Sequence, residues 1–153
     1  MSRSRSSLGS LLLAVFPVLS SAGGILHVPA QYATIQEAID AASPGDTVLV
    51  ADGTYRGPGN RDIEFRGKAI TVRSEHGAQA CVLDCDGTAQ DPHRGFRIRE
   101  HEGPDSVVDG FTIQNGYAPY EPSCLYSGGG IVCDQSSPTI RNCVITRNAT
   151  AGY

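Results

Sequence analysis

The chain is poor in positive charge. Its 153 residues include 12 Lys and Arg against 16 Asp and Glu, which gives a formal net charge of −4, and Lys68 is the only lysine. Proteins that bind nucleic acid concentrate Lys and Arg on one surface to neutralise phosphates. The charge balance therefore argues against nucleic acid as a partner.

Long apolar runs are also missing. The main one, residues 8–19, follows two early arginines and precedes the small residues 20–22. It is shorter than the roughly 20 apolar residues that cross a bilayer, and this order is typical of a secretory signal. We expect residues 1–22 to be a signal peptide and the mature chain, 23–153, to be secreted or displayed at the cell surface, without a membrane-spanning segment. The alternative is a buried N-terminal helix.

Several sequence patterns that mark reactive sites are absent. The three glycines 128–130 are followed by Ile131 and Val132, whereas a phosphate-binding loop needs Lys and then Ser or Thr. No serine lies in a G-x-S-x-G element. The histidines are scattered, and we expect all of them on the surface or in loops.

The cysteine pattern does not indicate a metal. In a strand, Cys81 and Cys85 would lie roughly 13 Å apart, too far for a disulfide. Cys124, Cys133 and Cys143 lack the C-x₂₋₄-C pairs of zinc sites. We expect buried, unpaired thiols, and the alternative is one disulfide among the last three cysteines.

One segment predicts a helix. Thr34 and Glu37 have the spacing of a capping box, and Ile35, Ala38 and Ile39 then form an apolar stripe at helical spacing. An amphipathic helix of this kind would cover the end of a stack of strands.

After Asp46, short apolar runs alternate with turn residues, which predicts strands. The candidates are Thr47–Val50, 63–65, 70–72, 81–83, Phe96–Ile98, 107–113, Ile131–Cys133 and 139–145. Asp52 and Gly53 would form a hairpin turn by local rules, and the alternative fold is therefore an antiparallel sandwich.

Internal repetition favours a parallel arrangement instead. Phe65, Ile98 and Cys133 recur at nearly equal spacing in three aligned segments. The second strands of these segments align Ile70, Phe111 and Cys143, and Asn115 and Asn148 follow as turn residues that could form a ladder. Short repeats cannot bury an apolar face alone, so equivalent strands are expected to stack about 4.8 Å apart.

Residues 28–57, "VPAQYATIQEAIDAASPGDTVLVADGTYRG", resemble the N-terminal cap and first coil of pectin-lyase-like proteins. The segments "GKAITVRSEHG", "VVDGFTIQNG" and "GGGIVCDQSSPTIRNCVITRN" resemble the coil repeats of secreted right-handed β-helix proteins. The resemblance implies an all-β fold, a right-handed parallel β-helix (solenoid) with a short N-terminal capping helix. Since such a stack needs a cap at both ends, we expect the chain to be C-terminally incomplete, and completed by further coils or by another chain.

The catalytic elements of this superfamily are not present in the chain. The Asn-Thr-Asp and Gly-His-Gly strings of polygalacturonases do not occur, nor do the Gln-Asp-Thr and Asp-Phe-Ile-Phe strings of pectin methylesterases. The arginine motif of pectate lyases is missing as well. We therefore expect an exported module for extracellular polysaccharide binding or surface display, without a complete active site. The alternative is the N-terminal part of a pectin-class lyase or hydrolase.

Two candidate sites remain. Asp84 and Asp86 form the best acidic cluster, and calcium is the cation that such oxygen ligands would hold; the alternative is a turn at the end of a strand. Arg99, Arg141, Tyr117 and Tyr120 are the candidate polysaccharide-binding residues. The arginines alternate with apolar residues or lie on the last repeat, and such arginines more often belong to a solvated strand face. The tyrosines could equally anchor their loop.

Overall fold

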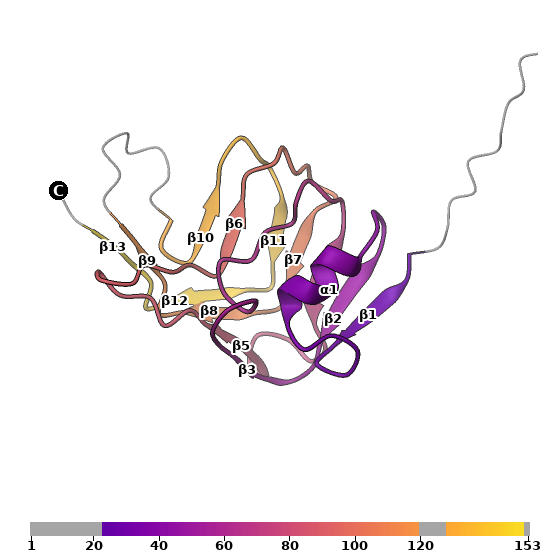
Figure 1. The fold of residues 1–153 in the computed structure, drawn as a ribbon, viewed down its shortest axis with the longest axis horizontal. Coiled ribbons are helices and arrows are strands. Elements are labelled where there is room, and N and C mark those ends of the chain that lie inside the picture. The colour runs from indigo at the N-terminus through magenta and orange to yellow at the C-terminus, as the bar shows by residue number, and fades with distance from the viewer. Residues whose placement is uncertain (1–22, 120–127, 152–153) are drawn as a thin grey trace, which may run out of the picture.

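The computed structural model describes residues 23–119 and 128–151 of the chain. Short strands dominate it, together with one short helix, and all strand pairs are parallel (Figure 1). The elements are β1 (Ile25–Val28), α1 (Ile35–Ala41), β2 (Thr47–Val50), β3 (Gly53–Tyr55), β4 (Thr71–Ser74), β5 (Cys81–Asp84), β6 (Phe96–Ile98), β7 (Val107–Asp109), β8 (Thr112–Gln114), β9 (Tyr117–Ala118), β10 (Ile131–Cys133), β11 (Thr139–Arg141), β12 (Val144–Thr146) and β13 (Ala149–Thr150). Within the described residues, no helix is long and apolar enough to cross a membrane.

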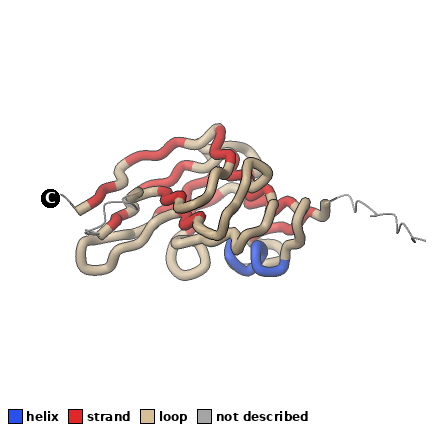
Figure 2. The backbone as a smooth tube through the Cα atoms, turned by 90° about the horizontal axis from the view of Figure 1, so that it is seen from above, coloured by secondary structure: helices blue, strands red, loops and turns tan. Residues whose placement is uncertain are grey.

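The chain visits the sheets in turn, and we call each round a pass. One sheet has the order β1-β2-β4-β7-β11 and a second has the order β12-β8-β5-β3. Strands β6 and β10 form a third sheet, and β9 and β13 form a fourth. Each strand therefore pairs with a strand from the neighbouring pass, and the strands lie in stacked rows (Figure 2).

The predicted hairpin turn at Asp52 and Gly53 is not formed. Strand β2 pairs with β1 and β4, whereas β3, which follows directly, pairs with β5 in another sheet. The chain turns a corner at this point instead of folding back, because the backbone of Gly53 donates to Ala80 of the next pass. The antiparallel sandwich is therefore excluded for the described residues.

The predicted equivalences are confirmed only in part. Cys133 pairs with Ile98, and the bridge between Ile63 and Phe96 continues the same sheet one pass earlier. Ile70 does not align with Phe111, because β4 pairs with β7 and not with β8. The corner between β7 and β8 is much shorter than the one between β4 and β5, and aligning apolar patterns missed this difference in length.

Single residues in the left-handed region form the tight corners of the last two passes. Gly110 (φ 80°) and Asn142 (φ 54°) stand between the equivalent strand pairs β7–β8 and β11–β12. Asn115 (φ 55°) and Arg147 (φ 54°) stand at the next corner. Asn148 bonds backbone as predicted, accepting from Gly116 N at 2.7 Å, but Arg147 and not Asn148 is equivalent to Asn115. The predicted Asn115–Asn148 ladder is therefore wrong.

The interior contains a column of three phenylalanines. The ring centroids of Phe65 and Phe96 lie 6.2 Å apart, as do those of Phe96 and Phe111, with interplanar angles of 54° and 59°. All three side chains are fully buried. Tilted pairs at this distance add to the free energy of burial, so the column joins the passes along the stack.

Helix α1 begins and packs as predicted. The Thr34 hydroxyl accepts a hydrogen bond from Glu37 N at 3.2 Å, and the Glu37 carboxylate accepts one from Ala33 N at 3.0 Å. Ile35, Ala38 and Ile39 are buried, and the helix packs against β1 and β2. It thus covers the apolar interior near the end where the described chain begins (Figure 2).

The only lysine of the sequence, Lys68, forms hydrogen bonds at the C-terminal end of this helix. Lys68 Nζ donates to the carbonyl oxygens of Ile39, Asp40 and Ala42 at 2.8, 2.9 and 2.8 Å. The carbonyl of Ile39 also accepts from Ala42 N at 3.1 Å, and a cation is favourable at this end of the helix dipole.

Replacing Phe96 by Ala is expected to lower the free energy of unfolding by about 3–5 kcal/mol, because the change leaves a cavity between two buried rings. Urea denaturation measures this, and Phe96→Leu should cost less because it refills part of the space. A loss below about 1 kcal/mol for Phe96→Ala would show that the column is not packed as described.

Lys68→Met is expected to lower the free energy of unfolding by about 1–3 kcal/mol, because three carbonyl oxygens lose a charged donor. The matched control is Arg73→Met on the exposed side of β4, which should change it by less than about 0.5 kcal/mol. Equal effects of the two substitutions in urea denaturation would contradict a special role for Lys68.

Candidate functional site

A polar groove of about 580 Å³ lies across the ends of β3, β5, β8 and β12, which are neighbours in one sheet. Its lining comes from consecutive passes, so the groove extends in the stacking direction. The lining residues are Arg56, Asp84, Asp86, Gly87, Asn115, Gly116, Tyr117, Arg147 and Ala149.

Asp84 is the central group of the groove and is already hydrogen-bonded within the fold. Its Oδ2 accepts from Arg56 Nη2 at 2.7 Å and Nε at 3.1 Å, and its Oδ1 accepts from Asn115 Nδ2 at 2.9 Å. Arg56 comes from the preceding pass and Asn115 from the following one. Asp84 therefore links three passes.

These contacts decide the charge of Asp84. The residue is only 5% exposed. Burial raises the pKa of its carboxyl group, but the hydrogen bonds from Asn115 and Arg56 outweigh burial, so the pKa lies below its ordinary value. Asp84 is consequently ionised in the folded state at neutral pH.

Two other charged groups line the groove and, unlike Asp84, do not link one pass to another within the described residues. Asp86 and Arg147 are exposed and both have left-handed backbone angles, with φ of 49° and 54°. No hydrogen bond or ion pair joins either side chain to another residue in the described part of the chain. One carboxylate and one guanidinium therefore remain open to a ligand.

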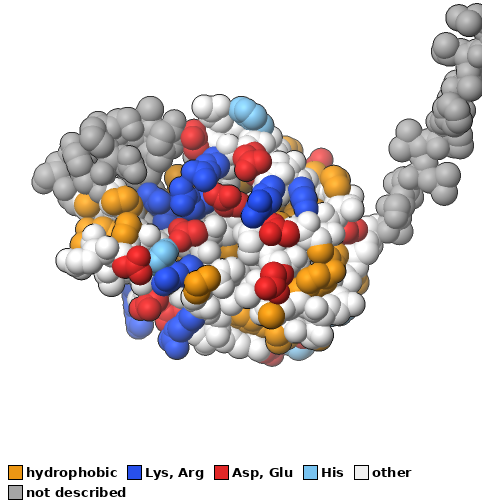
Figure 3. Space-filling model, in the orientation of Figure 1, with side chains coloured by type: hydrophobic (Ala, Val, Ile, Leu, Met, Phe, Trp, Pro, Cys, Tyr) orange, Lys and Arg blue, Asp and Glu red, His pale blue; other side chains and the backbone are white. Residues whose placement is uncertain are grey.

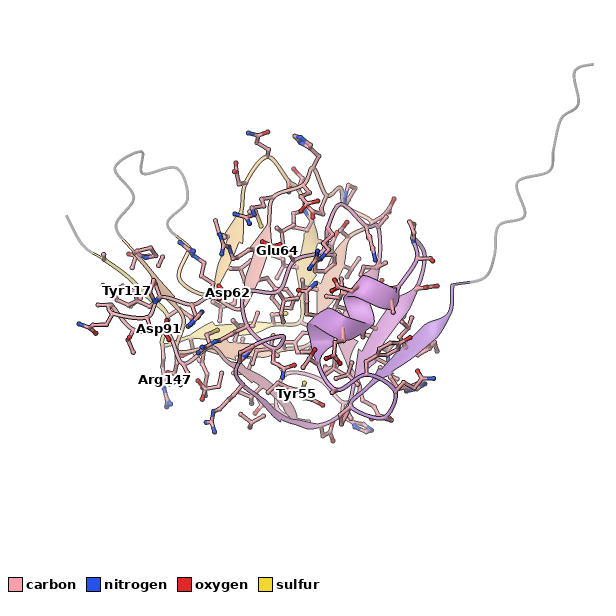
Figure 4. The ribbon with its side chains drawn as sticks, in the orientation of Figure 1. Tyr55, Asp62, Glu64, Asp91, Tyr117 and Arg147 are labelled. Carbon is pink, nitrogen blue, oxygen red and sulfur yellow. The ribbon has the colours of Figure 1, made fainter. Side chains whose placement is uncertain are left out.

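Tyr117 adds an aromatic ring beside these charges. It begins β9, is half-buried, and its backbone N donates to His93 O at 2.7 Å. Gly116 precedes it, and a Cβ there would lie 2.1 Å from Gly129 O, so no side chain fits at this point. Tyr117, Arg147 and Asp91 lie at the same end of the molecule (Figure 4).

The two arginines predicted to bind polysaccharide, Arg99 and Arg141, lie outside the groove. Arg99 follows β6 and forms an ion pair with Glu64 at 2.6 Å, whereas Arg141 lies on β11 of another sheet and pairs with Asp109 at 3.0 Å. Neither lines the groove. Oppositely charged side chains are interspersed over much of the visible surface (Figure 3).

Of the other predicted residues, the groove brings together Asp84, Asp86 and Tyr117. Tyr120 lies outside the described residues. Arg56, Asn115 and Arg147 were not predicted for the site. The signal that identifies them is that each directly follows a strand, at corners that stack in the fold.

Asp109, which does not line this groove, has hydrogen bonds like those of Asp84. It accepts from Arg141 Nε at 3.0 Å and Asn142 Nδ2 at 2.8 Å. Arg, Asn and Asp therefore serve as a structural corner in this fold. The Asp84 corner differs because Asp86 and Arg147 stand next to it, and neither side chain is paired with another of the described residues.

The carboxylates do not fit a calcium site as they stand. Calcium takes six to eight oxygen ligands, whereas Arg56 already occupies Asp84 Oδ2 and Asp86 alone remains open. No group of three His, Cys, Asp or Glu side chains within the described residues could hold a metal. Calcium at Asp84 and Asp86 stays an untested prediction.

The thiols offer no nucleophile in the groove. Cys81 and Cys85 are buried and unpaired as predicted, and burial raises the pKa of each thiol to about 12. Cys133 and Cys143 are also unpaired, but Cys133 is exposed, so its predicted burial is wrong. Cys124 lies outside the described residues.

Comparison of the chain with family models, with curated proteins and with solved structures finds no match. The groove must therefore be interpreted from its own chemistry.

Asp84→Asn is expected to lower the free energy of unfolding by about 1–3 kcal/mol at pH 7, because the bond to Arg56 loses its charge. The lowered pKa of Asp84 sets the sign: its contribution is present above the ordinary aspartate pKa and disappears as pH falls through the folded value. The difference between variant and parent in urea denaturation should thus shrink below about pH 4. The exposed Asp105→Asn is the control, and a pH-independent penalty for Asp84→Asn would contradict the assignment.

Proposed function

We propose that this protein is an exported module that binds an extended polysaccharide in the groove. The observation that carries the proposal is the combination of Tyr117 with the open side chains of Asp86 and Arg147 across the ends of neighbouring parallel strands. Aromatic rings pack on sugar faces, and charged groups bond hydroxyl or carboxylate substituents. A groove that extends over several passes suits a chain better than a single small molecule.

We further propose that the fold is a right-handed parallel β-helix of the pectin-lyase-like kind. Parallel pairing in every sheet, the recurrence of the same sheets on each pass, and a helix near one end support this. Export is supported by the residues alone, since the early arginines, the apolar run 8–19 and the small residues after it are typical of a signal peptide.

Binding is favoured over hydrolysis by the state of Asp84. A glycosidase needs two carboxyl groups free to act on one sugar bond, one of them as an acid. The Asp84 carboxylate is held by Arg56 and Asn115, and its pKa is lowered, which is the wrong direction for a general acid at neutral pH. Surface display remains compatible with a binding groove.

Arg147→Ala and Tyr117→Ala are each expected to weaken polysaccharide binding by roughly tenfold, since each removes an interaction worth about 1–2 kcal/mol. The measurement is calorimetric titration with polygalacturonate and, as a neutral polymer, a β-glucan.

Arg99→Ala is the matched control, because Arg99 is bound to Glu64 outside the groove. It should leave the affinity unchanged. If the parent protein retains neither polymer, or if Arg99→Ala weakens binding as much as Arg147→Ala, the groove is not the binding site.

A further inference from the structure

A histidine beside the groove faces two carboxylates at once. His93 Nδ1 lies 2.5 Å from Asp62 Oδ2, and Nε2 lies 3.1 Å from Asp91 Oδ1. The side chains of His93 and Asp62 are 20% and 25% exposed, whereas that of Asp91 is 71% exposed. The ring therefore links a partly buried carboxylate of one pass to an exposed carboxylate of the next.

This geometry selects one protonation state of the ring. An ionised carboxylate only accepts hydrogen bonds, and a neutral imidazole has a single N–H. Both contacts can be hydrogen bonds only when both ring nitrogens of His93 carry a proton. After loss of one proton, the shorter and less exposed contact to Asp62 keeps its donor, and the contact to Asp91 becomes a repulsion between lone pairs.

The loop 86–93, which joins this cluster to the groove, is fixed at both ends. Gly87 N donates to Asn115 O at 2.8 Å, and Tyr117 N donates to His93 O at 2.7 Å. A Cβ at Gly87 would lie 2.6 Å from His93 O, so the first turn of the loop lies directly against its end. Asp86 and Gly87 line the groove, so a change in this loop would reshape its wall.

Other charged and titratable groups lie close to this cluster. Arg61 Nη2 lies 3.8 Å from Asp91, and its Nη1 donates to Cys85 O at 3.1 Å. The thiol of Cys85 stays neutral, because burial raises its pKa to about 12. Arg94 is buried, with its Nε donating to Gly128 O, and the backbone N of Tyr117 on β9 donates to His93 O.

We propose that doubly protonated His93 is a latch that holds the loop 86–93 in place as the wall of the groove. Loss of the second proton releases Asp91, loosens the loop and weakens ligand binding. Histidine is the side chain that changes charge between pH 5 and 8, so the latch would make binding tighter on the acidic side. The effect on affinity rests on the proposed function, whereas the effect on the loop does not.

The loop is tested first, without a ligand. Residues Thr88, Ala89 and Gln90 carry no titratable side chain, so their Cα and carbonyl chemical shifts report the loop conformation. These shifts should change between pH 5.5 and pH 8 in the parent protein and should stay constant in His93→Gln, which cannot be doubly protonated. His76→Gln is the matched control, since His76 contacts Asp52 in an exposed pair and should leave the pH response unchanged.

Asp91→Asn provides a second variant in case His93→Gln fails to fold. It keeps the shape of Asp91 and removes its charge, so it should also reduce the pH response. Constant shifts in the parent protein, or an undiminished response in both variants, would overturn the latch.

Affinity for polygalacturonate is the second measurement. It should fall roughly three- to tenfold from pH 5.5 to pH 8 in the parent protein and stay level in His93→Gln. If the loop responds but the polymer is bound at neither pH, the latch stands and the proposed function fails. If the polymer binds at both pH values and the loop does not respond, the latch alone fails.

Discussion

Every other feature of this structure depends on the parallel pairing of each strand with a strand from the neighbouring pass. Because the pairing repeats, residues with the same role arrive next to one another, as the rings of Phe65, Phe96 and Phe111 do in the interior. The same repetition aligns the corners, where Arg147 follows Asn115. The groove is thus a product of the register, since its lining residues come from separate segments of the chain and lie at or next to the ends of strands.

The corner built around Asp84 shows how the fold and the site share one set of charges. Asp84 bonds to Arg56 and Asn115 and so joins successive passes, as Asp109 does with Arg141 and Asn142. A charge that is used in this way cannot also serve a ligand at low cost. The charged side chains of the groove that no corner hydrogen bond uses, among the described residues, are those of Asp86 and Arg147, and they lie beside Tyr117.

Local signals were read from the sequence more reliably than distant ones. The start of α1 could be predicted because Thr34 and Glu37 interact within one turn, and the repeats were enough to expect parallel strands. The alignment of Ile70 with Phe111 failed because the corners differ in length from pass to pass. Arg99, which alternates with apolar residues, and Arg141, on the last repeat, were predicted to bind polysaccharide. Alternation along a strand says nothing about the partner that a side chain meets, and each meets a carboxylate. Arg147 and Asn115 reach the groove through left-handed corners, which become visible only once the register is known.

The triple hydrogen bond of Lys68 has a chemical consequence. As this is the only lysine side chain in the sequence, any reagent that acylates lysine amines has a single side-chain target, and that target holds the end of α1 over the apolar interior. Neutralising one amine would remove the charged donor from three carbonyl oxygens together. Attachment of a dye or a surface through lysine would therefore act on the lid of the stack itself.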